Sequence, residues 1–239
     1  MQSANHLNGF SVYRGMETTK KTSRKSESKA SEDRIKAAYI ESVLTQGQRP
    51  VSVYKFCMDL GIKEEEFYNL FGSFDGLENH IWKGFIDKTI SRLRSDKAFQ
   101  TFITREKILA FYFTLLEELK SNRSYVLFQL EHFRKFEIVP EYIKGFKAEF
   151  ESFFESLLNV GKGSGEVARR PILDKRYPQL FWLHLGFILL FWKEDNSPGF
   201  EKTDAAIEKS VNLAFDLIGK GAVDSAIDFA KFLYQNKIK

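Results

Sequence analysis

The stretch VSVYKFCMDLGIKEEEFYNLFGS, residues 51–73, carries the pattern of two short helices joined by a tight turn. Pro50 and Ser52 are predicted to start the first helix. Gly61 suits the left-handed backbone of a sharp turn, and the second helix begins near Glu64. Apolar residues recur at helical spacing in both: Val53, Phe56, Cys57, Leu60, Phe67, Leu70 and Phe71. Two helices joined by a short turn that contains glycine are typical of a helix-turn-helix.

The helical spacing of apolar residues extends through the rest of the chain, and no segment alternates more clearly as a strand would. A helix is predicted to begin at Ser31, because Glu32 and Asp33 favour the positive end of the helix dipole. A loop is predicted to open at Gly161 and to run to about Lys175. Further helices are predicted at Phe102–Phe133 (two, meeting near Ser121), Pro140–Val160, Tyr177–Trp192, Lys202–Ile218 and Ala222–Tyr234. The predicted fold class is all-α, with about nine or ten helices.

The net positive charge is concentrated at the start of the chain. Residues 1–36 hold eight Lys or Arg and four Asp or Glu, a net charge of +4, which equals that of all 239 residues. Residues 1–30 contain too few apolar side chains to fold alone. We therefore predict a disordered basic arm at 1–30, a helix-turn-helix domain at 31–78 and a helical domain at 79–239. A basic arm attracts phosphate-rich partners, although its composition suits a solubilising tail equally well.

The sequence offers little for metal, redox or nucleophilic chemistry. Cys57 is the only cysteine, and the four histidines are too scattered for a metal site. No Ser-His-Asp or Cys-His pattern is recognisable, so we expect no catalytic residue, no metal, no cofactor and no enzyme activity. The longest apolar run, Leu180–Trp192, is shorter than the ~20 residues of a membrane span. Because no secretory signal pattern is present, we expect a cytoplasmic protein.

Residues 31–86 resemble the N-terminal DNA-binding region of the TetR family of repressors. The similarity includes Gly47, Ser52-Val53, Phe56-Cys57 and Leu60-Gly61-Ile62. Its most specific part is Phe67-Tyr68-Asn69-Leu70-Phe71-Gly72-Ser73, with Leu77 behind it. The resemblance implies a three-helix DNA-binding domain followed by a larger helical domain for ligand binding and dimerisation.

The resemblance also implies which residues contact double-stranded DNA. The second helix of the motif would enter the major groove, with Ser52, Lys63 and Tyr68 on phosphates and Asn69 on a phosphate or a base edge. The run Glu64-Glu65-Glu66 departs from the family pattern, because carboxylates repel phosphates. Glu64 or Glu65 remains a candidate reader, since Glu accepts a hydrogen bond from cytosine N4, and acids also stabilise a helix N-terminus. The basic residues of Lys20–Lys36 would compensate by lying along the DNA. Tyr68 has the alternative role of a half-buried packing residue.

In the same family the last two long helices form a four-helix bundle with a partner chain, which implies a homodimer here. Tyr177–Trp192 is apolar on nearly all sides and is predicted to be buried all round, partly against a second subunit. The alternative is the central helix of a monomeric bundle. The side chains assigned to the dimer interface are Phe181, Leu185, Ile188, Trp192, Ile207 and Val211.

A second resemblance covers Phe191–Thr203, which is similar to a junction in a TetR-fold lipid-binding protein of ubiquinone biosynthesis. It implies an alternative in which the fold has no DNA role and binds a hydrophobic small molecule or lipid. Ligand pockets are mostly apolar with few polar groups. The helical spacing makes the following residues pocket candidates, each of which is also explained as core: Phe111, Tyr112, Leu115, Phe128, Gln129, His132, Phe150 and Phe154.

Two hypotheses result. The first is a dimeric transcriptional regulator of TetR type that responds to a small apolar ligand. The alternative is a TetR-fold lipid-binding or interaction protein that does not bind DNA.

Overall fold

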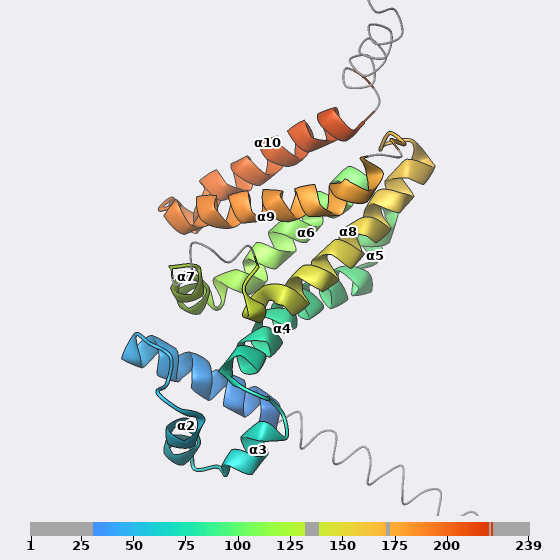
Figure 1. Cartoon of the computed structure of the whole chain (residues 1–239). Coiled ribbons are helices and arrows are strands. Elements are labelled where there is room, and N and C mark those ends of the chain that lie inside the picture. The colour runs from blue at the N-terminus through green and yellow to red at the C-terminus, as the bar shows by residue number, and fades with distance from the viewer. Residues whose placement is uncertain (1–30, 132–138, 171–172, 220, 222–239) are drawn as a thin grey trace, which may run out of the picture. The chain divides into compact units, whose positions relative to one another are not determined.

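The computed structural model describes residues 31–131, 139–170, 173–219 and 221. All regular secondary structure in these residues is helical, as the sequence predicts (Figure 1). The chain divides into two compact units, the first ending at Leu77 and the second beginning at Glu78. This division lies one residue before the boundary predicted from the sequence. The predicted arm at 1–30 and the predicted helix at Ala222–Tyr234 lie outside the described residues.

The first unit is built around a cluster of aromatic rings. It contains a helix at residues 31–46, α2 (Val53–Leu60), α3 (Glu64–Tyr68) and the start of α4 (Phe74–Ser95). The ring of Phe74 lies 5.3–5.8 Å from the rings of Tyr39, Phe56 and Phe67, so it joins all the helices of the unit. The pairs of Phe74 with Phe56 and Phe67 are edge-to-face, and such pairs add about 0.5–1.5 kcal/mol each to the free energy gained by burial. They help to explain how two short helices, α2 of eight residues and α3 of five, form a stable unit with their neighbours.

The second unit contains the rest of α4 and the following helices: α5 (Lys97–Thr101), α6 (Thr104–Lys120), α7 (Arg123–Glu131), α8 (Lys144–Ser164), α9 (Tyr177–Glu194) and α10 (Glu201–Ile218). Helix α8 packs on α6 and α9, and α10 packs on α6 and α9, which lies beside it in Figure 1. The core is aromatic: the Phe111 ring lies within 5.6 Å of the rings of Phe150, Phe153 and Phe154. None of the described helices is both long and apolar enough to cross a membrane.

The prediction that a loop opens at Gly161 is wrong, because α8 continues to Ser164 and ends at Gly165, whose φ is +86°. A Cβ atom at Gly161 would lie only 2.8 Å from Val167 Cγ2 and 3.0 Å from the Thr104 side chain. Glycine at this position therefore lets α8 approach the start of α6 closely. Glu166 reinforces this contact by accepting hydrogen bonds from the backbone N–H groups of Thr104 and Arg105.

The junction between α9 and α10 is held by one carboxylate and one guanidinium. Asp195 accepts four hydrogen bonds, two from Ser197 and two from Thr203, and so caps the start of α10. Burial by itself would raise the pKa of Asp195, but these hydrogen bonds outweigh it and hold the pKa well below its usual range. The Arg123 guanidinium lies 4.6 Å from the ring centres of both Trp192 and Phe200. Phe200, one of the two rings in contact with Arg123, has a left-handed backbone conformation with φ of +69°.

A hydrogen-bonded chain of three side chains joins α6, α9 and α10. His184 Nδ1 lies 2.7 Å from the Tyr112 hydroxyl, and its Nε2 lies 2.8 Å from Ser210 Oγ. Ser210 donates to the carbonyl oxygen of Ala206, so the proton between His184 and Ser210 belongs to Nε2. Burial lowers the pKa of His184 from 6.5 to about 4, which keeps the ring neutral at pH 7.

This arrangement does bring a histidine beside a serine, although the sequence shows no such pair. A nucleophilic serine must donate its proton to the histidine, whereas Ser210 Oγ accepts from Nε2 here. The group at Nδ1 is a buried tyrosine, and burial raises the pKa of Tyr112, so it remains a neutral donor. The three side chains therefore connect helices and do not activate Ser210.

The close approach at Gly161 predicts opposite effects for two neighbouring substitutions in α8. Gly161→Ala should lower the free energy of unfolding by about 1–2 kcal/mol, because the added methyl group must displace Thr104 and Val167. Gly163→Ala should raise it by about 0.5 kcal/mol, because a Cβ atom there meets open space and alanine favours the helix. Urea denaturation of both variants checks this. Equal effects of the two substitutions would contradict the packing described.

Neutral His184 predicts a pH-dependent stability. The unfolded state binds the histidine proton near pH 6.5, whereas the folded state binds it only near pH 4. Between these values the unfolded state holds more protons, so stability falls as the pH falls. After allowance for solvent screening, the wild type should lose roughly 2 kcal/mol more than His184→Gln, which cannot titrate. Denaturation curves at pH 7 and pH 4.5 measure the difference, and parallel losses in both proteins would contradict it.

Candidate functional site

The helix-turn-helix predicted from residues 51–73 is present in the first unit (Figure 1). Ser52 caps α2, with its Oγ accepting a hydrogen bond of 3.1 Å from the Lys55 backbone. Gly61 ends α2 in the left-handed conformation, with φ of +70° and ψ of +36°. Helix α3 then begins at Glu64 and has only five residues, because the chain turns at Asn69-Leu70. It is shorter than the apolar spacing through Phe71 predicts.

The structure places most of the residues predicted to contact DNA at the surface. Ser52, Lys63, Glu65, Tyr68 and Asn69 are exposed, and Glu64 is partly exposed. Tyr68 is 52% exposed, and its ring touches the buried Phe67 ring edge-on at a centre distance of 5.5 Å. The polar tip of Tyr68 is thus presented beside Asn69 at the end of α3. Contact of these residues with DNA stays a prediction.

The three glutamates of α3, which the sequence makes look alike, differ in the structure. Glu66 Oε1 accepts a hydrogen bond of 3.2 Å from the Lys63 backbone, so Glu66 helps to cap its own helix. Burial raises the pKa of the Cys57 thiol, and the nearby charges of Glu64 and Glu66 raise it further. Glu65 is exposed. Glu66 is exposed as well, so all three carboxylates could face a partner, and Glu66 alone has a capping role in addition.

The charge of the described first unit is unfavourable for phosphate binding. Residues 31–77 contain five Lys or Arg and eight Asp or Glu, a net charge of −3. Three of the five cations are in ion pairs, Lys36 with Glu32, Arg49 with Asp75 and Lys55 with Asp59. Arg34 donates to the carbonyl oxygen of Leu60. Within residues 31–77 this leaves Lys63, beside α3, as the cation most available to an external anion.

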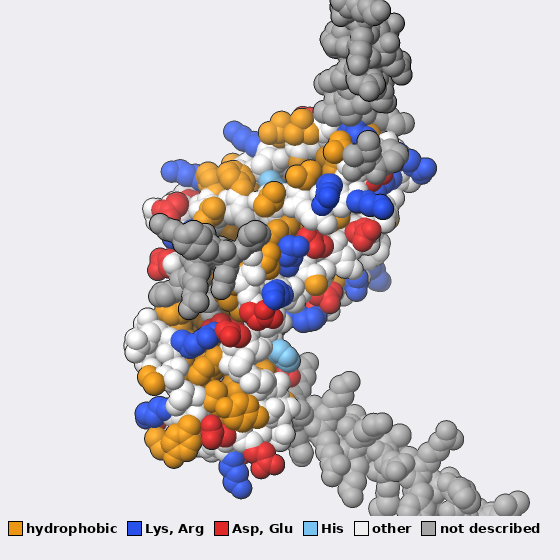
Figure 2. Space-filling view, in the orientation of Figure 1, with side chains coloured by type: hydrophobic (Ala, Val, Ile, Leu, Met, Phe, Trp, Pro, Cys, Tyr) orange, Lys and Arg blue, Asp and Glu red, His pale blue; other side chains and the backbone are white. Residues whose placement is uncertain are grey.

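A second candidate surface is the outward face of α9 and α10, which we call the α9–α10 face. It exposes large apolar side chains at a spacing of three or four residues: Leu180, Leu183, Phe187, Leu190, Phe191, Leu213 and Leu217. Leu183 is 68% exposed, and Figure 2 shows hydrophobic side chains gathered over these two helices. Exposed apolar patches of this kind mark interaction sites on soluble proteins. One face of Tyr177–Trp192 is therefore exposed in the single chain, so the predicted burial on all sides would require a second subunit and stays a prediction.

The residues assigned from the sequence to the dimer interface lie on the opposite face. Their exposed fractions are all 4% or less, because they pack into the core of their own chain: Phe181, Leu185, Ile188, Trp192, Ile207 and Val211. They are not available to a second chain, and this assignment has to be corrected. Because both faces of α9 are apolar, periodicity alone did not distinguish the inner face from the outer one.

The predicted pocket residues form part of the aromatic core. Phe111, Tyr112, Leu115, Phe150 and Phe154 are fully buried, and the rings of Phe150 and Phe154 stack at 4.1 Å. Gln129 is also buried and donates to the Tyr125 hydroxyl. Phe128 is partly exposed, and His132 lies outside the described residues. An apolar ligand pocket among these residues stays a prediction.

Comparison with known proteins places the second unit in a described family. A model of the tetracyclin repressor-like C-terminal domain matches residues 107–233, which is more than half of the chain. No curated protein matches the sequence.

Two solved structures share the fold. One is assigned to the TetR family of transcriptional regulators and comes from Syntrophomonas wolfei; it is 14% identical, with a TM-score of 0.66, over 82% of this chain and 98% of that one. The other is a protein of unknown function from Rhodococcus sp. RHA1, 10% identical, with a TM-score of 0.54, over 80% and 96% of the two chains. Because the family model covers most of the second unit and a helix-turn-helix precedes it, the chain belongs to the tetracycline repressor-like (TetR) family.

Proposed function

We propose that this chain is a dimeric transcriptional regulator that binds double-stranded DNA through the helix-turn-helix at residues 52–69. The observation that supports this most directly is the exposure of Tyr68 and Asn69 at the end of α3, on a motif whose core is complete. Hydroxyl and amide groups of this kind donate to phosphates and base edges. Ser52 and Lys63 lie at the starts of α2 and α3, where they would position the motif on the backbone.

The basic arm supplies the attraction that the first unit lacks. Residues 1–30 contain six Lys or Arg and two Asp or Glu, a net charge of +4, against −3 for residues 31–77. Each phosphate contact by a cation releases bound counterions, which supplies much of the affinity for DNA. We infer that the arm provides most of these contacts, while α3 reads the groove. Specific binding would then depend on both segments.

The α9–α10 face supports the proposed dimer. It runs along α9 and extends onto the C-terminal part of α10 at Leu213 and Leu217, and a self-complementary surface of this kind can join two identical chains. Two copies of this face, packed antiparallel or nearly so, would bury the exposed leucines against each other. A dimer would present two helix-turn-helix motifs, which reach half-sites about one DNA turn (~34–36 Å) apart when suitably spaced.

Removing the arm or the exposed tyrosine should weaken DNA binding by different routes. Deletion of residues 1–30 should reduce affinity at least tenfold and make its salt dependence shallower, because fewer phosphates are neutralised. Tyr68→Ala should reduce affinity by about 1 kcal/mol and leave the salt dependence nearly unchanged. Fluorescence anisotropy with duplexes from upstream of the gene, at 50–300 mM salt, measures both. Phe113→Ala, which removes a partly exposed ring from α6 in the other unit, is the control.

The double variant Glu64→Gln/Glu65→Gln separates the two hypotheses, and Glu66 is left unchanged because it caps α3. A DNA reader should bind with the natural glutamates and tighten moderately when they are neutralised. If a folded dimer binds no duplex and binding appears only in the double variant, the natural protein is not a DNA reader.

The dimer should dissociate when charge is placed on the α9–α10 face. Leu183→Glu combined with Leu190→Glu should convert the dimer to a monomer, because two carboxylates per chain would be buried without partners. Val160→Glu, at a similarly exposed apolar position on α8, should leave the dimer intact. Sedimentation velocity distinguishes the two states. A monomeric wild type, or equal dissociation by Val160→Glu, would refute the proposed interface.

The charge of the first unit favours the alternative function, a family member that does not bind DNA. A net charge of −3 around α3, with most cations already paired, would repel phosphates. Extraction of the purified protein with organic solvent, followed by mass spectrometry, tests this alternative. A co-purifying lipid together with absent DNA binding would favour it, whereas an empty protein that binds DNA would exclude it.

A further inference from the structure

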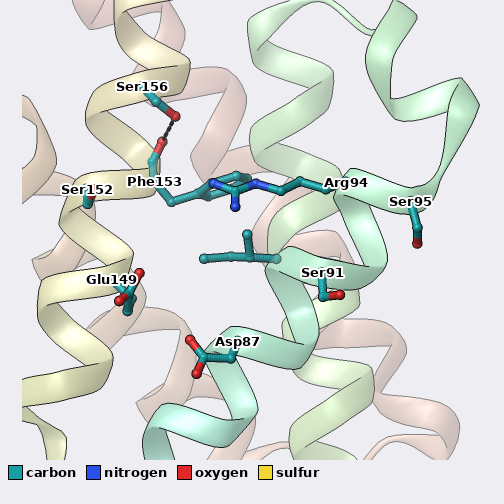
Figure 3. Close-up of a pocket in the computed structure, with 9 residues that line it drawn as sticks. Asp87, Ser91, Arg94, Ser95, Glu149, Ser152, Phe153 and Ser156 are labelled. Atoms are coloured by element: carbon teal, nitrogen blue, oxygen red, sulfur yellow. Dashed lines mark hydrogen bonds between the residues drawn. The ribbon is translucent and has the colours of Figure 1, made fainter. Parts of the chain in front are cut away.

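The second unit contains a groove between α4 and α8 that no part of the proposed DNA or dimer surfaces uses. Its volume is about 470 Å³, within the ~300–1,000 Å³ typical of small-molecule sites. Four serines line its walls, Ser91 and Ser95 from α4 and Ser152 and Ser156 from α8 (Figure 3). Each pair is spaced by four residues, so both serines of a helix lie on the side that faces the groove.

At one end of the groove, α4 packs directly against α8 and against the 3-10 helix Glu141–Ile143 that precedes it. There, Asn79 donates to the Glu141 carbonyl oxygen at 2.9 Å, and the rings of Trp82 and Phe146 are 5.8 Å apart. The approach is close enough that a Cβ atom at Gly145 would lie 2.7 Å from Asn79. Two turns further along, the short serine side chains leave the space between α4 and α8 unfilled.

The charge of the groove is divided between its two ends. Near the closed end, Lys83 Nζ lies 2.9 Å from Asp87 and 3.2 Å from Glu149, so it holds both carboxylates. At the other end, Arg94 extends from α4 across the gap in front of the Phe153 ring, with 5.9 Å between guanidinium and ring centre (Figure 3). Seven residues of helix separate Asp87 from Arg94, or ~10 Å, which exceeds the Debye length of ~8 Å at physiological salt.

The Arg94 guanidinium differs from that of its neighbour Arg92. Arg92 makes an ion pair of 2.8 Å with Glu117. No carboxylate of the described residues pairs with Arg94, whose guanidinium makes only the contact with Phe153. A guanidinium presents a planar fork of donors that fits a carboxylate or a phosphate. The end of the groove formed by Arg94 therefore offers an uncompensated cation beside an aromatic surface.

The serines provide both hydrogen-bond acceptors and hydrogen-bond donors along the walls of the groove. Ser95 and Ser156 donate to the carbonyl oxygens of Arg92 and Phe153, so their oxygens remain as acceptors. Ser91 and Ser152 make no hydrogen bond to any described residue and can donate to a ligand. Ile90 and Phe153, both nearly buried, give the groove an apolar floor.

We propose that this groove binds a small organic anion, a carboxylate or a phosphate monoester. Its anionic group pairs with Arg94, its body lies on Ile90 and Phe153, and its polar substituents reach Ser91 and Ser152. An organic cation is disfavoured, because the only acids of the groove are already held by Lys83. This inference concerns ligand binding by the second unit alone and does not depend on whether the chain binds DNA.

Isothermal titration calorimetry with matched aromatic probes tests the site in the full-length protein. Benzoate and phenyl phosphate carry the predicted anionic groups, benzyl alcohol is uncharged, and benzylamine carries the opposite charge. One or both anions should bind in a saturable manner, at least tenfold more tightly than the other two probes. Saturable binding of benzylamine in preference to the anions, or of no probe at all, would overturn the proposal.

Two variants locate the site. Arg94→Gln should weaken anion binding at least tenfold, whereas Arg92→Gln, two residues away on the same helix, should leave it unchanged. Ser152→Trp changes an exposed position and should block the groove without disturbing the core. Circular dichroism confirms that each variant is folded. Equal weakening by Arg92→Gln and Arg94→Gln would show unspecific attraction to positive charge, and undiminished binding in Ser152→Trp would place the anion elsewhere; either result refutes the site.

Discussion

The packing of α9 is the constraint on which the second unit depends. One face of this helix enters the aromatic core, where Phe181 meets the Phe154 ring at 5.2 Å and Leu185 and Ile188 are fully buried. The other face leaves a row of leucines exposed. Burying a leucine is worth about 1.5–3 kcal/mol, so the inner face stabilises the chain while the outer face retains a strong tendency to associate. A helix that is apolar on both sides thus stabilises the fold with one face and, in the proposed dimer, contacts a second chain with the other.

Polar contacts determine how the neighbouring helices meet α9. His184, Tyr112 and Ser210 connect it with α6 and α10 through a neutral chain of hydrogen bonds. Asp195 and Arg123 fix its C-terminal end, where the direction of the chain reverses. Buried polar groups are costly when they lack a partner, and the side chains of Tyr112, His184 and Asp195 all make hydrogen bonds here. They therefore determine how α10 packs on α9, and with it where the exposed Leu213 and Leu217 lie relative to α9.

The first unit shows a tension between family membership and charge. Its helix-turn-helix has the capped first helix, the left-handed glycine and the exposed end of the second helix that contact with a duplex requires. The net charge of −3 on residues 31–77 opposes such contact, and the excess of positive charge lies in residues 1–30. With this division, the affinity for DNA would depend on the basic arm, and the orientation of the protein on DNA would depend on the helix-turn-helix. The groove beside Arg94 adds a further basic position, in the second unit.

The sequence by itself determined the all-helical fold, the position of the helix-turn-helix and the identity of most core aromatics. Helical periodicity and glycine turns are local properties, and residues 51–73 show both. Only the tertiary structure decided which face of α9 is inside, because both faces are apolar and the choice depends on α6, α8 and α10. The same holds for Gly161, whose helical conformation follows from close contact with Thr104 and Val167. The tertiary structure also showed that no carboxylate of the described residues pairs with Arg94. The sequence could not show this, because periodicity carries no information on neighbours that are distant in the chain.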